Sequence, residues 1–251
     1  MATPITITIC GDGGCGTHSS QQAYLTLLTS PGKSSITLRI VRGQWTHEYD
    51  PTIEDSYSVT RTLDGATYNI SITDTAGQEE YRSMWSAANM HSDAFLLVYD
   101  ITSSSSLQQL AYFTELIDVE CQNRQEAGEC WPALMILGNK CDLQSQRQVQ
   151  AREALEWSRS RGYGFMETSA REMVNIEETI SAVVKRVVEA RRMHAQGLRQ
   201  PVPGAASPVA RTETKSSNPN GDVSGFYDKS EKRAQEPKKK KQGFFASLKC
   251  W

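Results

Sequence analysis

Several features that would place this chain in a membrane, outside the cell or around a metal ion are missing from its sequence. It contains no run of about eighteen apolar residues, the least that a membrane-spanning helix needs. Its six cysteines form no C-x-x-C pair, and its four histidines have no ligand spacing. Residues Met1 to Pro4 lack the charged-then-apolar pattern of a secretory leader. These absences predict a reduced protein that is made and folded in the cytosol, without a disulfide framework or a zinc site.

Net charge is also nearly absent, at −2 over 251 residues, but it is unevenly distributed. Residues Gln196 to Trp251 hold eleven Lys and Arg against five Asp and Glu, about +6 in net charge, which leaves about −8 for the rest. The same segment has few apolar residues before Phe244 and Phe245, so it cannot bury enough surface to offset its ordering entropy. We expect one domain over 1–195 and a disordered basic tail over 196–251 that meets an anionic membrane surface rather than a nucleic acid.

Short buried strands alternate with amphipathic helices along the domain. Apolar or β-branched runs predict strands at 5–10, 94–99, 133–137 and 164–167, and a hairpin turns at Asp64-Gly65. Helices are expected over 34–42, around 107–117, over 147–160 and over 175–195. The last helix carries an apolar stripe made of Ile176, Ile180, Val183, Val184, Val187 and Val188. The pattern predicts an α/β fold with a mostly parallel, six-stranded sheet flanked by helices.

The sequence motif of a phosphate-binding loop is present but is divided into two segments. Gly11 to Gly16 follow the first strand, and their natural continuation is Lys33-Ser34-Ser35. Joined, they read G-x-x-x-x-G-K-S, a loop whose backbone N–H groups cradle phosphates while the lysine reaches the β/γ oxygens and the serine hydroxyl binds Mg²⁺. Residues Thr17 to Gly32 separate the two pieces.

Three further stretches follow predicted strands, at the edge where open parallel sheets bind ligands. Asp74 to Gln78 (DTAGQ) offers an acid for Mg²⁺ and a glycine N–H for a γ-phosphate. Asn139 to Asp142 (NKCD) offers a carboxylate that can accept hydrogen bonds from guanine N1–H and the 2-amino group, which adenine lacks, so this stretch favours GTP over ATP. Glu167 to Ala170 (ETSA) can support the base through backbone N–H groups.

In this order and spacing, the motifs resemble those of a Ras-type small GTPase over about Ile5 to Ala195, with details similar to the fungal Ras proteins. Residues Asp74 to Tyr81 are similar to the second switch of that family. The resemblance implies a P-loop NTPase G domain that binds GTP or GDP with Mg²⁺. The stretch similar to the Ras effector loop is Tyr49, Asp50, Pro51, Thr52, Ile53, Glu54, Asp55, Ser56 and Tyr57.

The resemblance also implies roles at the phosphates. Lys33 would bind the β/γ-phosphates and Gln78 would orient the attacking water, so these are the expected catalytic residues. Ser34, Thr52 and Asp74 would hold Mg²⁺. No arginine is evidently placed to act within the chain, so slow hydrolysis and a GTPase-activating protein are implied, together with an exchange factor and downstream effectors. Release of Thr52 and Gly77 after hydrolysis would make the molecule a switch.

At the base, Asn139 and Asp142 would read guanine, Lys140 would pack along the ring, and Ser169 and Ala170 would contact the guanine carbonyl. The complete expected nucleotide-binding set is Gly11, Asp12, Gly13, Gly14, Cys15, Gly16, Lys33, Ser34, Ser35, Thr52, Asp74, Gly77, Asn139, Lys140, Asp142, Ser169 and Ala170.

The interruption of the phosphate loop leaves two explanations and two functions open. In the Ras family the Mg²⁺ threonine follows the loop lysine by the same spacing as Thr52 follows Lys33, which makes 17–32 the extra segment. It is either a genuine insertion or a retained intron: codons GGT for Gly16 and CCA-GGN for Pro31-Gly32 would give it GT and CAG ends without disturbing the frame. The chain is then either a GTP-binding switch or a nucleotide-free interaction module, because Gly16 and Lys33 must both line one tight anion nest.

The tail departs from the family pattern as well. Ras-like tails end in C-a-a-X for prenylation, whereas this chain ends at Cys250-Trp251. Lys238 to Lys241 are either solvated charge, an import-like run, or a membrane contact supported by Phe244 and Phe245. The resemblance favours the cytoplasmic face of the plasma membrane, with Cys250 as a possible lipidation site and a cytosolic location if the tail carries no lipid.

Overall fold

The structure is a computed structural model that describes residues 2–11, 32–43, 54–75 and 90–198. The chain divides into two compact units, residues 1–207 and 208–251, and every described residue belongs to the first. The expected tail beyond residue 198 lies outside the described residues, as do most of the extra segment and the loop at 76–89.

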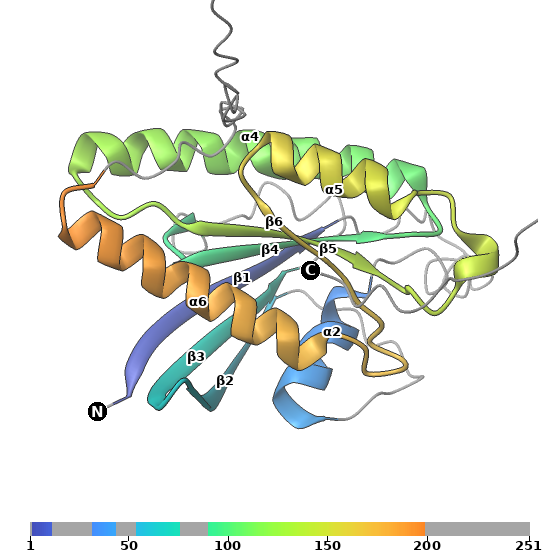
Figure 1. Ribbon diagram of the computed structural model, residues 1–251, viewed down its shortest axis with the longest axis horizontal. Coiled ribbons are helices and arrows are strands. Elements are labelled where there is room, and N and C mark those ends of the chain that lie inside the picture. The colour runs from blue at the N-terminus through green and yellow to red at the C-terminus, as the bar shows by residue number, and fades with distance from the viewer. Residues whose placement is uncertain (1, 12–31, 44–53, 76–89, 199–251) are drawn as a thin grey trace, which may run out of the picture. The chain divides into compact units, whose positions relative to one another are not determined.

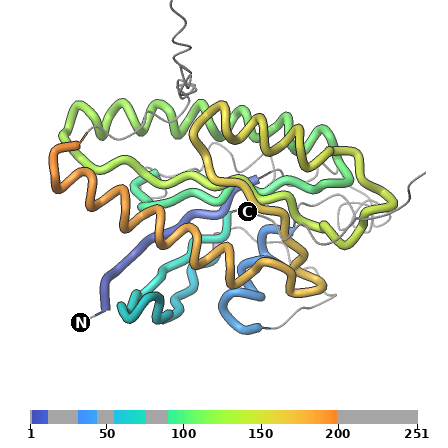
Figure 2. Tube along the Cα trace, viewed as in Figure 1, coloured from blue at the N-terminus to red at the C-terminus, as the bar shows by residue number. Residues whose placement is uncertain are grey.

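Six strands form one sheet in the order β2-β3-β1-β4-β5-β6 (Figures 1 and 2). All neighbours pair in parallel except β2 and β3, which form the expected antiparallel hairpin. The mostly parallel six-stranded sheet predicted from the sequence is therefore confirmed. The strands are β1 (Thr3–Gly11), β2 (Glu54–Leu63), β3 (Ala66–Thr75), β4 (Ala94–Asp100), β5 (Ala133–Asn139) and β6 (Gly164–Glu167).

Two helices cover each face of the sheet in the described part of the chain (Figure 1). Helices α2 (Lys33–Arg42) and α6 (Ile176–Ala195) pack on one face, and α4 (Ser104–Ala127) and α5 (Ala151–Ser160) pack on the other. No helix in the ranges just given has the length and apolar content to cross a membrane.

The two cores explain why the central strands read as continuous apolar runs. In β4, Leu96 faces α2 and α6, whereas its neighbours Phe95 and Leu97 face α4 and α5. Successive strand residues point to opposite faces, so a strand covered on both sides must be apolar at every position. All seven residues of β4 and all seven of β5 are buried accordingly.

Two expectations about the helices were wrong in detail. The helix expected to begin at Arg147 begins at Ala151, after the short 3₁₀ helix η2 (Gln144–Gln146). Arg147 stays outside the helix because its guanidinium is bound to Glu167 and to the carbonyl of Val149. Val188, expected in the buried stripe of α6, is 38% exposed, so the stripe ends at Val187.

The sheet brings the predicted motifs to one edge. The carboxyl ends of β1, β3, β4, β5 and β6 lie at the same edge because these strands are parallel. Strand β1 has β3 on one side and β4 on the other, which makes its carboxyl end the topological switch point where open α/β sheets bind ligands.

Candidate functional site

The phosphate side of the site is the start of α2. Gly32 adopts a left-handed conformation (φ 77°, ψ 37°), and its carbonyl accepts the first helical hydrogen bond, from the N–H of Ile36 at 3.0 Å. Lys33 and Ser34 therefore occupy the first turn, where the N–H groups that point along the axis and the helix dipole favour an anion. Lys33 is only 5% exposed, and its charge is close enough to lower the pKa of the buried Cys10 thiol, although burial raises that pKa by more.

At the end of β1, Gly11 pairs with Val98 of β4. A Cβ atom on Gly11 would overlap the Val98 carbonyl oxygen, so only glycine fits where the first piece of the phosphate loop begins. This close approach keeps the chain at the switch point as it leaves the sheet.

Asp74 lies beside the start of α2 at the end of β3. Its side chain is 1% exposed and accepts a hydrogen bond from the Ser34 hydroxyl. Burial raises the pKa of Asp74 to about 6, and the Ser34 hydrogen bond and the Lys33 charge oppose this rise. Its Oδ1 atom has no hydrogen-bond partner among the described residues.

The Ser34–Asp74 pair fits a magnesium ion. A buried carboxylate oxygen without a protein partner, next to a hydroxyl at a helix start, supplies the hard oxygen ligands that Mg²⁺ prefers. The described residues contain no group of three or more His, Cys, Asp and Glu that could cage a metal. Mg²⁺ is usually held by one or two carboxylates together with phosphates and water, and Asp74 offers one such carboxylate.

The base side of the site is formed by the loops after β5 and β6. Asn139 Oδ1 accepts hydrogen bonds from the Ala170 N–H at 3.2 Å and the Thr168 hydroxyl at 3.4 Å. Ser169 Oγ donates to Asp142 Oδ1 at 2.6 Å. The third and fourth predicted motifs thus interlock, which holds the Asp142 carboxylate in one orientation.

Lys140 is directed to the end of β4. Its Nζ lies 2.7 Å from Oδ2 of Asp100, a fully buried residue whose Oδ1 accepts hydrogen bonds from the backbone N–H and hydroxyl of Thr102. With the ammonium held there, the alkyl stem is the part of Lys140 that can pack along a ring. Asp100 is a member of the site that the sequence motifs do not mark.

The phosphate and base sides meet at Gly32 and Asn139. A Cβ atom on Gly32 would lie 2.5 Å from the Asn139 side-chain nitrogen, so the start of α2 contacts the end of β5 directly. The structure therefore joins Lys33, Ser34, Asp74 and the base loops into one site, as the expected roles require.

Arg39 of α2 adds a second link that sequence reasoning missed. Its Nε donates to the Ala170 carbonyl at 2.6 Å, and its two terminal nitrogens donate to the carbonyls of Arg171 at 2.8 Å and Gly43 at 2.9 Å. No sequence pattern marks Arg39, because its partners are main-chain oxygens and one lies 131 residues away. Arg39 thereby fastens the phosphate helix to the base loop.

A buried ion pair supports the base loops from behind. Arg147 contacts Glu167 through two hydrogen bonds of 2.6 and 2.9 Å, and both side chains are 11% exposed. The hydrogen bonds with Glu167 raise the pKa of Arg147. Because Glu167 is the last residue of β6, the pair ties the segment after η2 to the strand that leads into the base loop.

The backbone N–H groups expected to support the base are bonded within the protein. Those of Thr168, Ser169 and Ala170 donate to Gly138 O, Val174 O and Asn139 Oδ1, respectively. A guanine carbonyl would share or displace the 3.2 Å bond between Asn139 and Ala170. The sequence motif alone does not reveal this competition.

Several expected site residues lie outside the described residues: Asp12, Gly13, Gly14, Cys15, Gly16, Tyr49, Asp50, Pro51, Thr52, Ile53, Gly77, Gln78 and Cys250. Their roles stay predictions. Of the expected effector stretch, Glu54 to Tyr57 belong to β2, where Asp55 and Ser56 are exposed and Tyr57 is half-buried.

Comparison with known proteins gives concordant matches. The model of the Ras family matches residues 29–189, so the match begins just before Lys33 and excludes the glycines at 11–16. Two curated relatives from Dictyostelium discoideum are similar over most of the chain. The Ras-like protein rasX is 36% identical over 190 residues, covering 76% of this chain and 79% of the relative. The Ras-like protein rasZ is 35% identical over 183 residues, covering 73% and 75%.

Proposed function

This chain belongs to the Ras family, and on that premise we propose that it is a GTP-dependent switch whose nucleotide lies along the carboxyl edge of β1, β5 and β6. The observation that carries the proposal is the contact between Gly32 and Asn139. It joins a helix start suited to phosphates to a loop suited to guanine, although the two come from distant parts of the sequence.

On the phosphate side, Lys33 would bind the β/γ oxygens from the first turn of α2. Ser34 and Asp74 would hold Mg²⁺ together with Thr52. When bound, Mg²⁺ would neutralise charge that develops on the phosphate oxygens. Gln78 would orient the attacking water.

On the base side, the Asp142 carboxylate would accept hydrogen bonds from guanine N1–H and the 2-amino group, with Ser169 holding it in place. An adenine ring presents no donor at those two positions, so the half-buried Asp142 carboxylate would lose those partners. Lys140, anchored on Asp100, would lay its alkyl stem along the ring.

Signalling would use the stretch 49–57. Strand β2 stands at one end of the strand order and pairs only with β3 within the described residues, which leaves its outer edge to a partner. We propose that effectors bind there, that an exchange factor and a GTPase-activating protein set the nucleotide state, and that the basic tail brings the domain to the cytoplasmic face of the plasma membrane.

The proposal is tested by Mg²⁺-dependent binding of GTP and ATP to two purified forms, the chain as written and a chain without residues 17–32. GTP binding by the shortened form alone, with ATP ignored, would support the switch and identify the extra segment as inactivating. Failure of both folded forms to bind GTP would favour the nucleotide-free interaction module instead.

A base-side variant sharpens the test. Asp142→Asn should weaken GTP binding and improve binding of xanthosine triphosphate, because an amide N–H₂ complements a carbonyl at position 2 of the ring and opposes an amino group there. Unchanged GTP selectivity would show that Asp142 does not read the base.

A further inference from the structure

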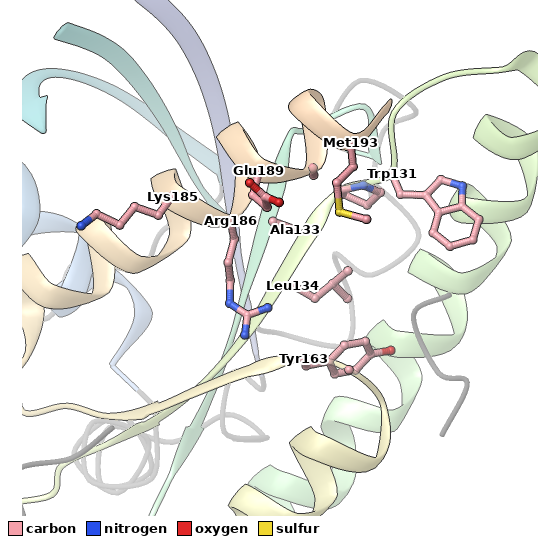
Figure 3. Close-up of a pocket in the computed structure, with 11 residues that line it drawn as sticks. Trp131, Ala133, Leu134, Tyr163, Lys185, Arg186, Glu189 and Met193 are labelled. Carbon is pink, nitrogen blue, oxygen red and sulfur yellow. The ribbon is translucent and has the colours of Figure 1, made fainter. Parts of the chain in front are cut away.

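A separate groove, drawn in Figure 3, is lined by residues at the amino ends of β5 and β6, whereas the proposed nucleotide site lies at their carboxyl ends. It has a volume of about 320 Å³ and is formed by the residues that lead into β5 and β6 and by the second half of α6. Its lining residues are Trp131, Pro132, Ala133, Leu134, Gly162, Tyr163, Lys185, Arg186, Glu189, Ala190 and Met193.

The groove is mainly apolar at its base. Leu134 is 4% and Tyr163 is 5% exposed, and Met193 extends over them from α6 (Figure 3). A volume of about 300 Å³ is at the lower end of the range for small-molecule sites. The shape and lining therefore suit a short aliphatic or aromatic body.

One charged side chain without a described partner, that of the exposed residue Arg186, borders this apolar space. The Arg186 guanidinium lies against Gly164, where a Cβ atom would come within 2.8 Å of Nε and 3.1 Å of Cζ. Figure 3 shows the side chain reaching from α6 toward Leu134 and Tyr163. Gly164 therefore supplies the room that the guanidinium occupies.

Arg186 makes no hydrogen bond or ion pair with any described residue. Burial alone lowers the pKa of its guanidinium, since no carboxylate acts on it. Arg186 as a residue is exposed and Arg stays protonated, so a solvent-accessible positive charge without a partner among the described residues stands beside the apolar groove.

The other ionic residues of the groove are already paired. Lys185 extends away to Asp64, at 3.0 Å (Figure 3). Glu189, one turn after Arg186, accepts hydrogen bonds of 2.9 and 2.7 Å from Arg192. Of the three ionic residues that line the groove, Arg186 is thus the one without a partner among the described residues.

We propose that this groove binds a small amphiphilic molecule with an apolar body and one carboxylate, which Arg186 holds through its two-pronged guanidinium. The planar guanidinium matches a carboxylate in geometry and charge. The apolar body would cover Leu134 and Tyr163. The proposal does not depend on nucleotide binding, since the groove shares no residue with the proposed GTP site.

Octanoate is a suitable probe, with octanol as its uncharged counterpart. We would follow backbone amide shifts of Leu134 and Ala190 by NMR in the full chain and in two single variants, Arg186→Gln and Lys185→Gln. Octanoate should shift both amides and bind at least about tenfold more weakly to Arg186→Gln, the loss expected for a charge-assisted hydrogen bond. Lys185→Gln, which removes the neighbouring positive charge, should leave octanoate binding unchanged, and octanol should not distinguish Arg186→Gln from the wild type.

Two results would overturn the proposal: equal octanoate affinity of the wild type and Arg186→Gln, or no shift at the groove up to about 10 mM, the weak limit for so small a ligand. Should Arg186→Gln fail to fold, Ala190→Leu narrows the groove while keeping the charge. It should abolish binding of both probes, and unaltered octanoate binding by that variant would equally refute the site.

Discussion

The α-carbon of Gly32 packs against the side-chain amide of Asn139, leaving no room for a Cβ atom between them. This contact brings the start of the phosphate helix to the guanine-reading loop. Two features require glycine before Lys33. One is this contact, and the other is the φ of 77°, which residues with a Cβ atom rarely adopt.

Replacing Gly32 by alanine should therefore abolish tight GTP binding. The variant Gly32→Ala combines left-handed strain of about 1–2 kcal/mol with a Cβ 2.5 Å from Asn139 Nδ2. In the form without residues 17–32 the glycine before Lys33 is Gly16, so the equivalent substitution there is Gly16→Ala. Fluorescent GTP titration and urea unfolding measure both effects in whichever form binds nucleotide.

Gly43→Ala is the matched control for this substitution. Gly43 has a φ of 65°, but no atom lies within 4 Å of the position that a Cβ atom would take there, so only the strain applies. Gly43→Ala should lose about 1 kcal/mol of stability and keep its GTP affinity. Equal loss of GTP affinity in both variants would contradict the role of the Asn139 contact.

Asp74 should make GTP binding dependent on Mg²⁺. The substitution Asp74→Asn keeps the shape of the side chain but removes the buried negative charge beside Ser34. We expect GTP affinity in millimolar Mg²⁺ to fall by more than about tenfold, whereas both proteins should bind alike in EDTA.

Asp55→Asn provides the control, because Asp55 is opposite Asp74 in the β2–β3 register but is exposed. It removes the same charge and should leave the Mg²⁺ dependence intact. An equal effect of the two substitutions would indicate general electrostatics rather than metal binding by Asp74.

Arg39 should act as a positioning residue for the base loop. Arg39→Ala removes three hydrogen bonds to the carbonyls of Ala170, Arg171 and Gly43. GDP should dissociate about tenfold faster, as expected when bonds worth about 1 kcal/mol each are lost from a loop that holds the base. Stopped-flow release of a fluorescent GDP measures the rate.

Arg42→Ala, at the exposed end of the same helix, tests whether the effect is specific. It removes a guanidinium without touching the base loop, and GDP release should keep the wild-type rate. If GDP dissociated from Arg39→Ala at the same rate as from Arg42→Ala, the positioning role would be refuted.

Breaking the Arg147–Glu167 pair by removing one partner should be strongly destabilising. Arg147→Ala leaves the Glu167 carboxylate, 11% exposed, without its partner, and should cost about 3 kcal/mol in unfolding free energy. Replacing both residues with apolar ones, R147M with E167L, should recover most of that loss because no buried charge is left unpaired. Urea denaturation measures each variant.

The exposed pair of Arg152 and Glu156 supplies the comparison, at 88% and 63% side-chain exposure. Arg152→Ala should leave the unfolding midpoint unchanged, because solvent screens such pairs. If the double variant at 147 and 167 were as unstable as Arg147→Ala, the loss would reflect packing rather than an uncompensated charge.

Much of the fold followed from local patterns. Strand β6 was expected over the same residues that form it, and the hairpin turn at Asp64-Gly65 was also located correctly. Apolar runs identify strands covered on both faces, and a turn residue pair identifies a hairpin, because both depend on neighbours in the sequence. The start of α5 was predicted wrongly because Arg147 is bound to Glu167, twenty residues away, and so stays outside the helix.

The sequence by itself determined the family and the order of the motifs, since side-chain chemistry at fixed spacing is written directly in the chain. Only the tertiary structure decided which of those motifs touch. The contact of Gly32 with Asn139 and the hydrogen bond from Arg39 to the Ala170 carbonyl both join residues more than a hundred positions apart. The place of the Arg186 guanidinium, which has no partner among the described residues, likewise depends on how α6 packs beside β6, because exposure, desolvation and pairing are properties of packed elements and not of the residues alone.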